Sequence, residues 1–361
     1  MKRHCFLLIL CLMLGCTLAA QDKPRFLYNV DFATWFDNRE YQRPLQIPQT
    51  LFSFRLSPEI GVGLSDRQGG SHRLIAGVHY TQPLGGNWKE VHFHPTAFYQ
   101  YQYKGFTMNI GAVPYKHFIR QLPDFLRYDS VAYAHPNIQG ALLQYSSRHG
   151  YVEAICDWRG MQSPTRREMF RITFDGEYSY QGFFRYFAGG VAQLNHKANH
   201  GAPTPREGVC DDIYASPNIG IDFAAPTPLD TICLRASYIY GYQRFRLDNL
   251  VYQPQGFMLE FMLRWRFLGL KNTFYVGDNL MPLYGMFGAD LNQGDPFYQS
   301  PLYNRTDLFI YIVRKGFVNC YFSWNMHYAA GTRLQNQQQL IVLFSLDGLK
   351  KEQRLRGLFD K

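Results

Sequence analysis

Residues 91–103 read VHFHPTAFYQYQY, and the alternation of side chains along this stretch decides the fold class. Apolar side chains such as Phe93 and Tyr99 fall on one face of an extended chain, whereas polar ones such as Gln100 fall on the other. Lys104–Gly105 follows as a tight turn, because glycine tolerates a positive φ, and the apolar alternation then resumes. The stretch therefore predicts a β-hairpin.

The same period-two pattern recurs along most of the chain. In 256–268, Phe257 and Leu259 alternate with Glu260 and Arg264, and the apolar face is long and aromatic. Strands of about nine to fourteen residues are close to the length that a tilted strand needs to cross a membrane. Sixteen such strands are predicted: 26–35, 51–64, 72–82, 90–103, 106–113, 138–146, 150–158, 168–175, 178–189, 212–223, 229–242, 256–268, 271–278, 306–314, 316–328 and 334–346.

The composition excludes several other classes of protein. Aromatic residues make up 17% of the 361 residues and charged residues 18%, which excludes a disordered chain and a coiled coil. Beyond the N-terminus no apolar run reaches about 18 residues, so membrane-spanning helices are excluded as well. The formal net charge is +9, but the chain contains no long run of Lys and Arg after residue 20. Nucleic acid is therefore not expected as a partner.

The connections between the predicted strands alternate in length. From the fourth strand onward, short turns at positions such as 104–105 and 269–270 alternate with longer loops such as 114–137 and 279–305. This asymmetry is typical of outer-membrane barrels, with short periplasmic turns and longer outer loops. The fold class predicted is all-β, a transmembrane antiparallel up-and-down β-barrel of about 16 strands, within a range of roughly 12–18.

The chain divides into three segments. Residues 1–20 combine a basic start, a short apolar run and small residues, which indicates a cleaved signal peptide and export to the cell outer membrane. Residues 21–346 form the predicted barrel, and 347–361 form a charged C-terminal tail. The sequence does not pair the cysteines of the exported chain, which are Cys156, Cys210, Cys233 and Cys320.

At the level of class, the chain resembles the Gram-negative outer-membrane β-barrels and is similar to porins. The resemblance rests on the signal peptide, the alternating loops and two hairpins, FYQYQYKGFTMNIGAVPY at 98–115 and NIQGALLQYSSRHGYVEAICDWRG at 137–160. The Ala-Gln junction at 20–21 and the Tyr-rich strands are similar to barrels of Bacteroides-like bacteria. The chain departs from the pattern at 347–361, because many such barrels end on an aromatic residue rather than a charged tail.

The resemblance implies a porin-like channel for passive diffusion of small hydrophilic solutes. A preponderance of arginine on the polar face favours anionic solutes, because lumen charge sets selectivity. The candidate lumen residues are Arg73, Arg171, Arg185, Arg235, Glu260, Arg264 and Arg266. If 114–137 folds inward as a constriction loop, its charged residues act on the solute: Lys116, Arg120, Asp124, Arg127 and Asp129. The partners expected are outer-membrane lipid, lipopolysaccharide, the solute and, as in many porins, further copies of the chain.

Two alternatives stay open beside the channel. The first is a plugged barrel that binds or tethers surface glycan through aromatic loops such as 279–305. The second is a barrel enzyme acting on lipid or glycan. No enzymatic activity is expected, because GxSxG, HExxH and the P-loop are absent and Ser146, Ser147 and His149 lie in a short turn.

No cofactor and no metal site are expected. His92 and His94 share a strand face with His79 close by, but two or three histidines are weak grounds for a metal site, because polar side chains commonly fill a barrel lumen.

Overall fold

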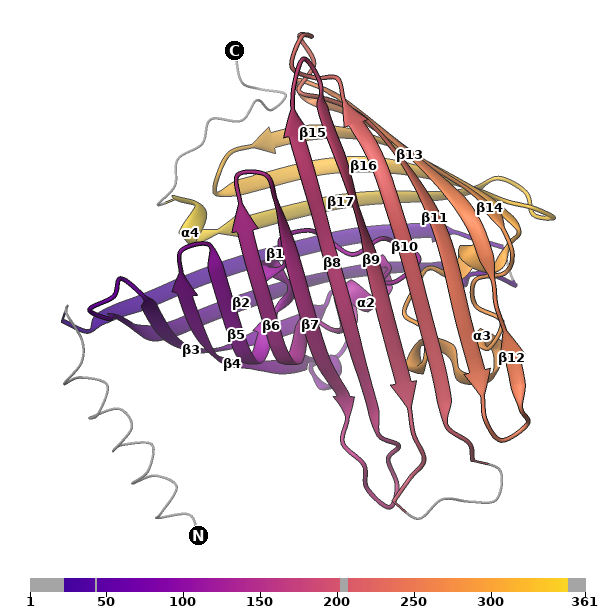
Figure 1. Ribbon diagram of the computed structural model, residues 1–361, viewed down its shortest axis with the longest axis horizontal. Coiled ribbons are helices and arrows are strands. Elements are labelled where there is room, and N and C mark those ends of the chain that lie inside the picture. Colours follow the sequence, from indigo (N-terminus) through magenta and orange to yellow (C-terminus); the bar gives the residue numbers. More distant parts are fainter. Residues whose placement is uncertain (1–22, 43, 202–206, 350–361) are drawn as a thin grey trace.

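A computed structural model shows the chain as a closed antiparallel β-barrel and describes residues 23–42, 44–201 and 207–349 (Figure 1). In these described residues, sixteen strands form the wall of the barrel. The predicted fold class, an antiparallel β-barrel, is confirmed. A further short strand, β12 (Leu250–Tyr252), pairs only with β11 and belongs to a loop.

The wall strands run in chain order around the barrel. Their bounds are β1 (Arg25–Glu40), β2 (Gln49–Ser65), β3 (Ser71–Pro83), β4 (His92–Tyr103), β5 (Phe106–Pro114), β6 (Asn137–Ser147), β7 (Gly150–Gly160), β8 (Met169–Gln181), β9 (Arg185–Lys197), β10 (Cys210–Asp222), β11 (Thr231–Phe245), β13 (Gln255–Trp265), β14 (Leu268–Gly277), β15 (Leu302–Arg314), β16 (Val318–Ala329) and β17 (Gln335–Ser345).

The helical segments are short and lie in the connections. They are η1 (Trp88–Glu90), η2 (Tyr115–His117), α2 (Asp129–Ala134), α3 (Tyr284–Phe287), η3 (Gly288–Asp290), η4 (Pro296–Gln299) and α4 (Leu346–Leu349). None of the helices in the described residues is long and apolar enough to cross a membrane.

The first and last strands close the ring. β1 pairs with β17 from Asp31↔Ser345 to Glu40↔Asn336, and β1 pairs on its other side with β2. In lipid every backbone N–H and C=O needs a partner inside the protein, and a closed sheet meets this requirement because it has no edge strands.

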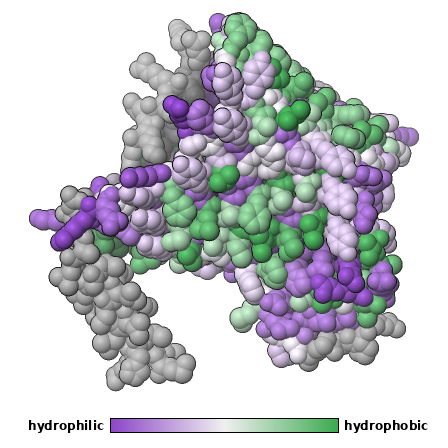
Figure 2. Space-filling view, viewed as in Figure 1, coloured by the Kyte–Doolittle hydropathy of each residue, from purple (hydrophilic) through white to green (hydrophobic). Residues whose placement is uncertain are grey.

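The two faces of the wall differ as the alternation predicts. On β13, Phe257 is 64% exposed and Leu259 43% exposed, whereas Met258 between them is buried. Hydrophobic residues cover much of the outward face of the strands, and hydrophilic residues gather where the long loops lie, at the lower right of Figure 2. The inward face is mostly polar, with buried residues such as Gln100 and Asn109.

One predicted turn is misplaced. The sequence predicts a strand that ends at 175 and another that starts at 178, whereas β8 continues to Gln181 and the turn falls at 182–184. Asp175 and Glu177 mimic a turn in the sequence, but both face the lumen, where they form ion pairs with arginines. Their charge therefore reflects lumen partners and not a change of chain direction.

The four cysteines of the described chain, Cys156, Cys210, Cys233 and Cys320, are all free thiols in the structure. The predicted signal peptide and nearly all of the predicted tail lie outside the described residues, and the division into segments stays a prediction.

Leu259→Arg tests which face of β13 meets lipid. Leu259 lies in the middle of the strand and faces outward, so we expect the arginine to lower the free energy of unfolding in vesicles by about 2–4 kcal/mol. Refolding into lipid vesicles, followed by gel mobility with and without heating, measures the change. Gln181→Arg, at the edge of the wall, is the control and should cost about 0–1 kcal/mol. An equal cost for both substitutions would contradict the assignment of the faces.

Candidate functional site

Two long loops fold into the barrel and meet inside it. They are the β5–β6 connection, 115–136, and the β14–β15 connection, 278–301, and we call them together the plug. Figure 1 shows their helices α2 and α3 within the ring of strands. Backbone hydrogen bonds join the two loops, from Asp295 N to Asp124 O at 2.8 Å and from Tyr128 N to Gln293 O at 3.1 Å.

An apolar core holds the plug against the wall. Phe125 and Leu126 of the first loop and Phe297 and Tyr298 of the second are at most 1% exposed. They form one cluster with inward-facing wall residues: Val191, Tyr214, Ile239, Met258, Tyr275, Tyr303 and Ala329. Because this core excludes water, it closes the part of the lumen next to β9–β16. A plugged lumen is what the glycan-binding alternative expects; glycan binding itself stays a prediction.

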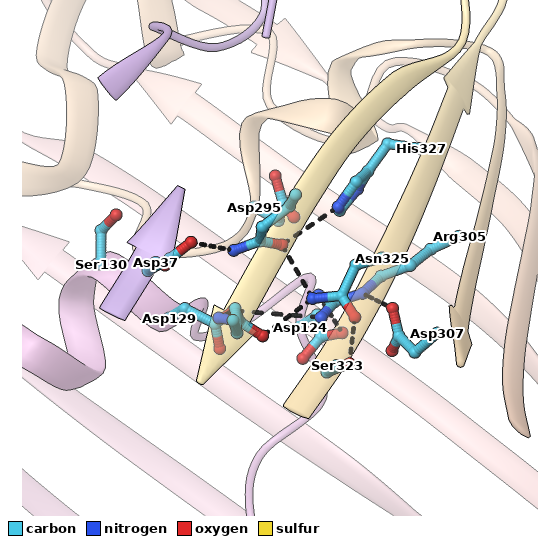
Figure 3. A network of polar contacts seen from close by, with 12 residues as sticks. Asp37, Asp124, Asp129, Ser130, Asp295, Arg305, Asp307, Ser323, Asn325 and His327 are labelled. Atoms are coloured by element: carbon cyan, nitrogen blue, oxygen red, sulfur yellow. Dashed lines mark hydrogen bonds and ion pairs between the residues drawn. The ribbon is translucent and has the colours of Figure 1, made fainter. Parts of the chain in front are cut away.

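A polar network fixes the other side of the plug (Figure 3). Arg305 on β15 contacts Asp307 at 2.7 Å and Asp124 of the first loop at 3.3 Å, with Asp129 at 3.9 Å. Removing a buried charge partner leaves the other charge uncompensated, which costs several kcal/mol. Ion pairs of the plug carboxylates therefore hold the plug to the wall in addition to its apolar packing.

The loop predicted as a constriction, 114–137, thus folds inside the barrel, and several of its charged residues form ion pairs with the wall. Lys116 contacts Asp31 at 2.6 Å and Glu59 at 2.5 Å, and Arg120 contacts Asp175 at 2.9 Å. Asp124 and Asp129 face Arg305, as described above. Arg127 has no carboxylate within ion-pair distance among the described residues. No observation tests whether these residues select a solute.

Three of the six predicted lumen arginines form ion pairs with wall carboxylates. Arg185 and Arg235 contact the same carboxylate, Glu177, at 2.7 and 2.8 Å. Arg171 is fully buried and contacts Asp157 at 2.8 Å.

The remaining predicted lumen residues are dispersed. Arg73 donates to Gln100 at 3.4 Å, and Glu260 and Arg264 lie on the inward face of β13. Arg266 differs from the prediction, because it lies beyond the end of β13 in a turn, with a φ of 54°. The predicted residues therefore do not converge on one site, and their part in selectivity stays a prediction.

A cavity of about 700 Å³ lies beside the plug. Plug residues such as Tyr115 and Asp129 line one end of it. It extends along the inward faces of β1, β2 and β15–β17 toward the end with the short turns, where Tyr311, Tyr321 and Leu343 line it. The cavity therefore combines a charged end at the plug with a mainly apolar and aromatic end.

Ser57, His79 and Asn137 form a hydrogen-bonded chain at this cavity. Ser57 and His79 are opposite each other on β2 and β3, since the register pairs Leu56↔Tyr80 on one side and Glu59↔Gly77 on the other. Ser57 Oγ lies 2.6 Å from His79 Nδ1, and His79 Nε2 lies 2.8 Å from Asn137 Oδ1. Both Ser57 and His79 line the cavity.

The surroundings of Asn137 fix the direction of each hydrogen bond. Its Nδ2 donates to Pro95 O at 3.0 Å and lies 3.3 Å from Thr96 Oγ1, so its Oδ1 is the atom that faces His79. His79 Nε2 must then carry the proton and donate it to Asn137 Oδ1. Nδ1 is left with a free lone pair that accepts from the Ser57 hydroxyl, which is the arrangement of a nucleophile and its general base.

Sequence reasoning missed Ser57 and Asn137 entirely. His79 was considered only beside His92 and His94 as a metal ligand, and it lies opposite His94 in the β3–β4 register. Among the described residues no group of three or more His, Cys, Asp or Glu side chains is arranged to hold a metal ion.

Comparison with known proteins gives a family and a fold. A family model described as Lipid A 3'-O-deacylase-type matches residues 18–347. Three similar solved structures are barrels: OpdL of Pseudomonas aeruginosa (13% identity, 89% of this chain and 98% of that chain, TM-score 0.53), OccK2 of P. aeruginosa in complex with glucuronate (11%, 91% and 99%, 0.51), and a mutant porin of Rh. blastica (12%, 89% and 100%, 0.50). No curated protein matches the sequence.

These comparisons confirm the predicted resemblance to outer-membrane porin-type barrels. They also correct one expectation. The absence of a catalytic motif predicts no enzymatic activity, and the match to a deacylase-type family contradicts this prediction. A short linear motif is a poor guide here, because the candidate catalytic side chains come from three different strands and meet only through the barrel register.

Asp295→Asn tests the electrostatics of the plug. Burial raises the pKa of Asp295 to about 6, so the proton binds more tightly when the plug is inserted than when it is released. Raising the pH through 6 should therefore weaken plug insertion, by about 3 kcal/mol at most. The asparagine oxygen can still accept from Gln46 and Phe297, and the variant should lose this pH dependence.

Thermal unfolding in micelles at pH 5 and pH 8, followed by tryptophan fluorescence, measures the difference, since Trp35 stacks on Tyr133 of the plug at 4.7 Å. Asp248→Asn, in an exposed loop, is the control and should behave as the unchanged protein. An Asp295→Asn variant with the same pH dependence as the unchanged protein would contradict the prediction.

Proposed function

Because the chain belongs to the Lipid A 3'-O-deacylase-type family, we propose that it is an outer-membrane hydrolase of ester-linked acyl chains. The observation that carries the proposal is the hydrogen-bonded chain from Ser57 through His79 to Asn137 at a luminal cavity. The family description names lipid A and O-deacylation, and we take an O-acylated lipid of that kind as the substrate.

The proposed reaction uses these three side chains in distinct roles. Ser57 Oγ attacks the ester carbonyl carbon while His79 Nδ1 takes its proton. The leaving alcohol then receives that proton as the C–O bond breaks, and the acyl group remains on Ser57. Water, deprotonated by His79, then attacks the acyl-serine, and the proton passes from His79 to Ser57 Oγ as the bond between Oγ and the acyl carbon breaks and the carboxylic acid leaves. Of the two other side chains in this chain of hydrogen bonds, Asn137 contacts only His79, and its part is to hold the imidazole in the tautomer with Nδ1 free.

The cavity suits such a substrate in shape and polarity. Its end near the short turns is lined by Phe309, Ile341 and Leu343, which are suited to an acyl chain. The end at the plug carries the charged groups that suit a polar head group. Outer-membrane lipid and lipopolysaccharide are accordingly the proposed partners.

A second candidate function is passage of small hydrophilic, anionic solutes. The porin-type barrel and the partly open lumen beside the plug favour it. Because the apolar core of the plug excludes water, we propose that passage requires the plug to move. This function differs from the first in needing no reacting side chain.

Ser57→Ala tests the hydrolase. We expect hydrolysis of p-nitrophenyl butyrate, and loss of an acyl chain from purified lipid A by mass spectrometry, to fall by about a thousandfold or more. The control is Ser237→Ala, a buried lumen serine on β11 outside this chain of hydrogen bonds, which should keep full activity. A folded Ser57→Ala barrel that retains full hydrolysis would refute the assignment of the nucleophile.

Gly294→Val tests the plug as a barrier. A Cβ at Gly294 would overlap the backbone oxygen of Phe125, so the substitution should separate the two plug loops. We expect frequent openings in a planar bilayer, against rare or no openings for the unchanged protein. Gly285→Val, in the same loop with open space around its Cβ, is the matched control. Equal conductance for all three proteins would show that the plug does not limit passage.

A further inference from the structure

We infer that Arg55 and Arg127 form a binding site for a phosphate group in the luminal cavity. Arg55 lies on β2 and Arg127 on the first plug loop, and both line the cavity that Ser57 and His79 also line. The inference deepens the proposed hydrolase by naming the group that holds the substrate, and it rests on that proposal only for the identity of the ester.

Arg55 is held in place by neutral groups alone. Its Nε donates to Thr81 Oγ1 at 2.9 Å, and its Nη2 donates to the backbone oxygen of Tyr133. Its guanidinium lies over the ring of Trp35, 5.2 Å from the centroid. These contacts orient the group and leave its positive charge uncompensated.

Arg127 on the first plug loop is likewise held by neutral groups. Its Nη2 donates to His135 O at 3.0 Å, and its guanidinium lies 3.6 Å from the centroid of the Tyr115 ring. Its Nε is buried and has no hydrogen-bond partner in the part of the chain that the structure describes. Burial is the main cause that lowers the pKa of Arg127, and Arg171 lowers it further, whereas Tyr115 and Asp157 act in the opposite direction.

The other charged groups of the cavity compensate one another. Lys116 is paired with Asp31 and Glu59, and Arg305 with Asp124 and Asp307. Within the described residues, neither Arg55 nor Arg127 has a carboxylate within 4.0 Å. Two uncompensated guanidinium groups facing one cavity match the double negative charge and the several acceptor oxygens of a phosphate monoester.

The position of the pair relates the phosphate to the reaction. Arg55 and Ser57 are two residues apart on β2 and therefore project from the same face of the strand. A phosphate held by Arg55 would therefore lie in the same cavity as the serine hydroxyl. The substrate class is accordingly an ester that carries a phosphate on the same head group.

Calorimetric titration of the full-length protein in micelles with inorganic phosphate tests the site. We expect the unchanged protein to bind phosphate, and the affinity to fall at least tenfold in Arg55→Gln and in Arg127→Gln. Acetate should bind the unchanged protein more weakly than phosphate does. Arg55→Lys, which keeps the charge, should bind more tightly than Arg55→Gln, and Arg148→Gln, in an exposed turn, should bind as the unchanged protein does. Circular dichroism of each variant confirms the barrel.

Two outcomes would overturn the site: no phosphate binding by the unchanged protein, or binding that neither glutamine variant weakens. Acetate binding as tightly as phosphate would replace the phosphate with a carboxylate and overturn the assigned chemistry. Hydrolysis of p-nitrophenyl butyrate, a neutral ester, separates this inference from the proposed function. Phosphate binding without hydrolysis would support the site and reject the hydrolase, whereas hydrolysis without phosphate binding would do the reverse.

Discussion

The pairing of β1 with β17 is the contact on which the rest of the structure depends. An open sheet in lipid would leave two rows of backbone donors and acceptors without partners, and the cost of those groups forces the ring to close. Closure of sixteen strands creates an interior too wide for wall side chains to fill. The long loops of 115–136 and 278–301 occupy part of that space, and the cavity is what they leave.

The interior combines two ways of filling space that make different demands on the sequence. On the side of β9–β16, loop and wall side chains such as Phe125 and Tyr214 form a dry core, as in a water-soluble protein. On the side of β1–β3 and β15–β17, charged side chains such as Arg305 and Lys116 are arranged around acidic partners. Arg55 and Arg127 depart from this pattern of compensation, and a departure of this kind is where a ligand is expected.

The sequence was a good guide to the wall and a poor one to the site, for reasons that lie in particular residues. Apolar side chains along 91–103 recur at every second residue, a period that fits a strand and not a helix. The alternation of short and long connections indicates which strand ends lie on the same side of the membrane. The turn predicted at 176–177 is wrong because a glycine followed by an acidic residue is typical of a turn. The same pair also occurs within a strand when the acidic side chain faces a lumen arginine, as Glu177 does. Ser57 and Asn137 left no signal, because Ser57 meets His79 only through the β2–β3 register and Asn137 comes from β6, so neither contact is local in the sequence.

Ring closure through β1 and β17 also has a consequence for assembly. The two strands are more than 290 residues apart in sequence at their paired positions, so the last contact of the ring cannot form until the C-terminal strand has been delivered. Contacts between residues so distant along the chain form slowly. The plug loops each join two neighbouring strands at one end of the ring, so their entry through that end does not depend on ring closure. Closure itself is the one step of assembly that has to wait for the C-terminal strand.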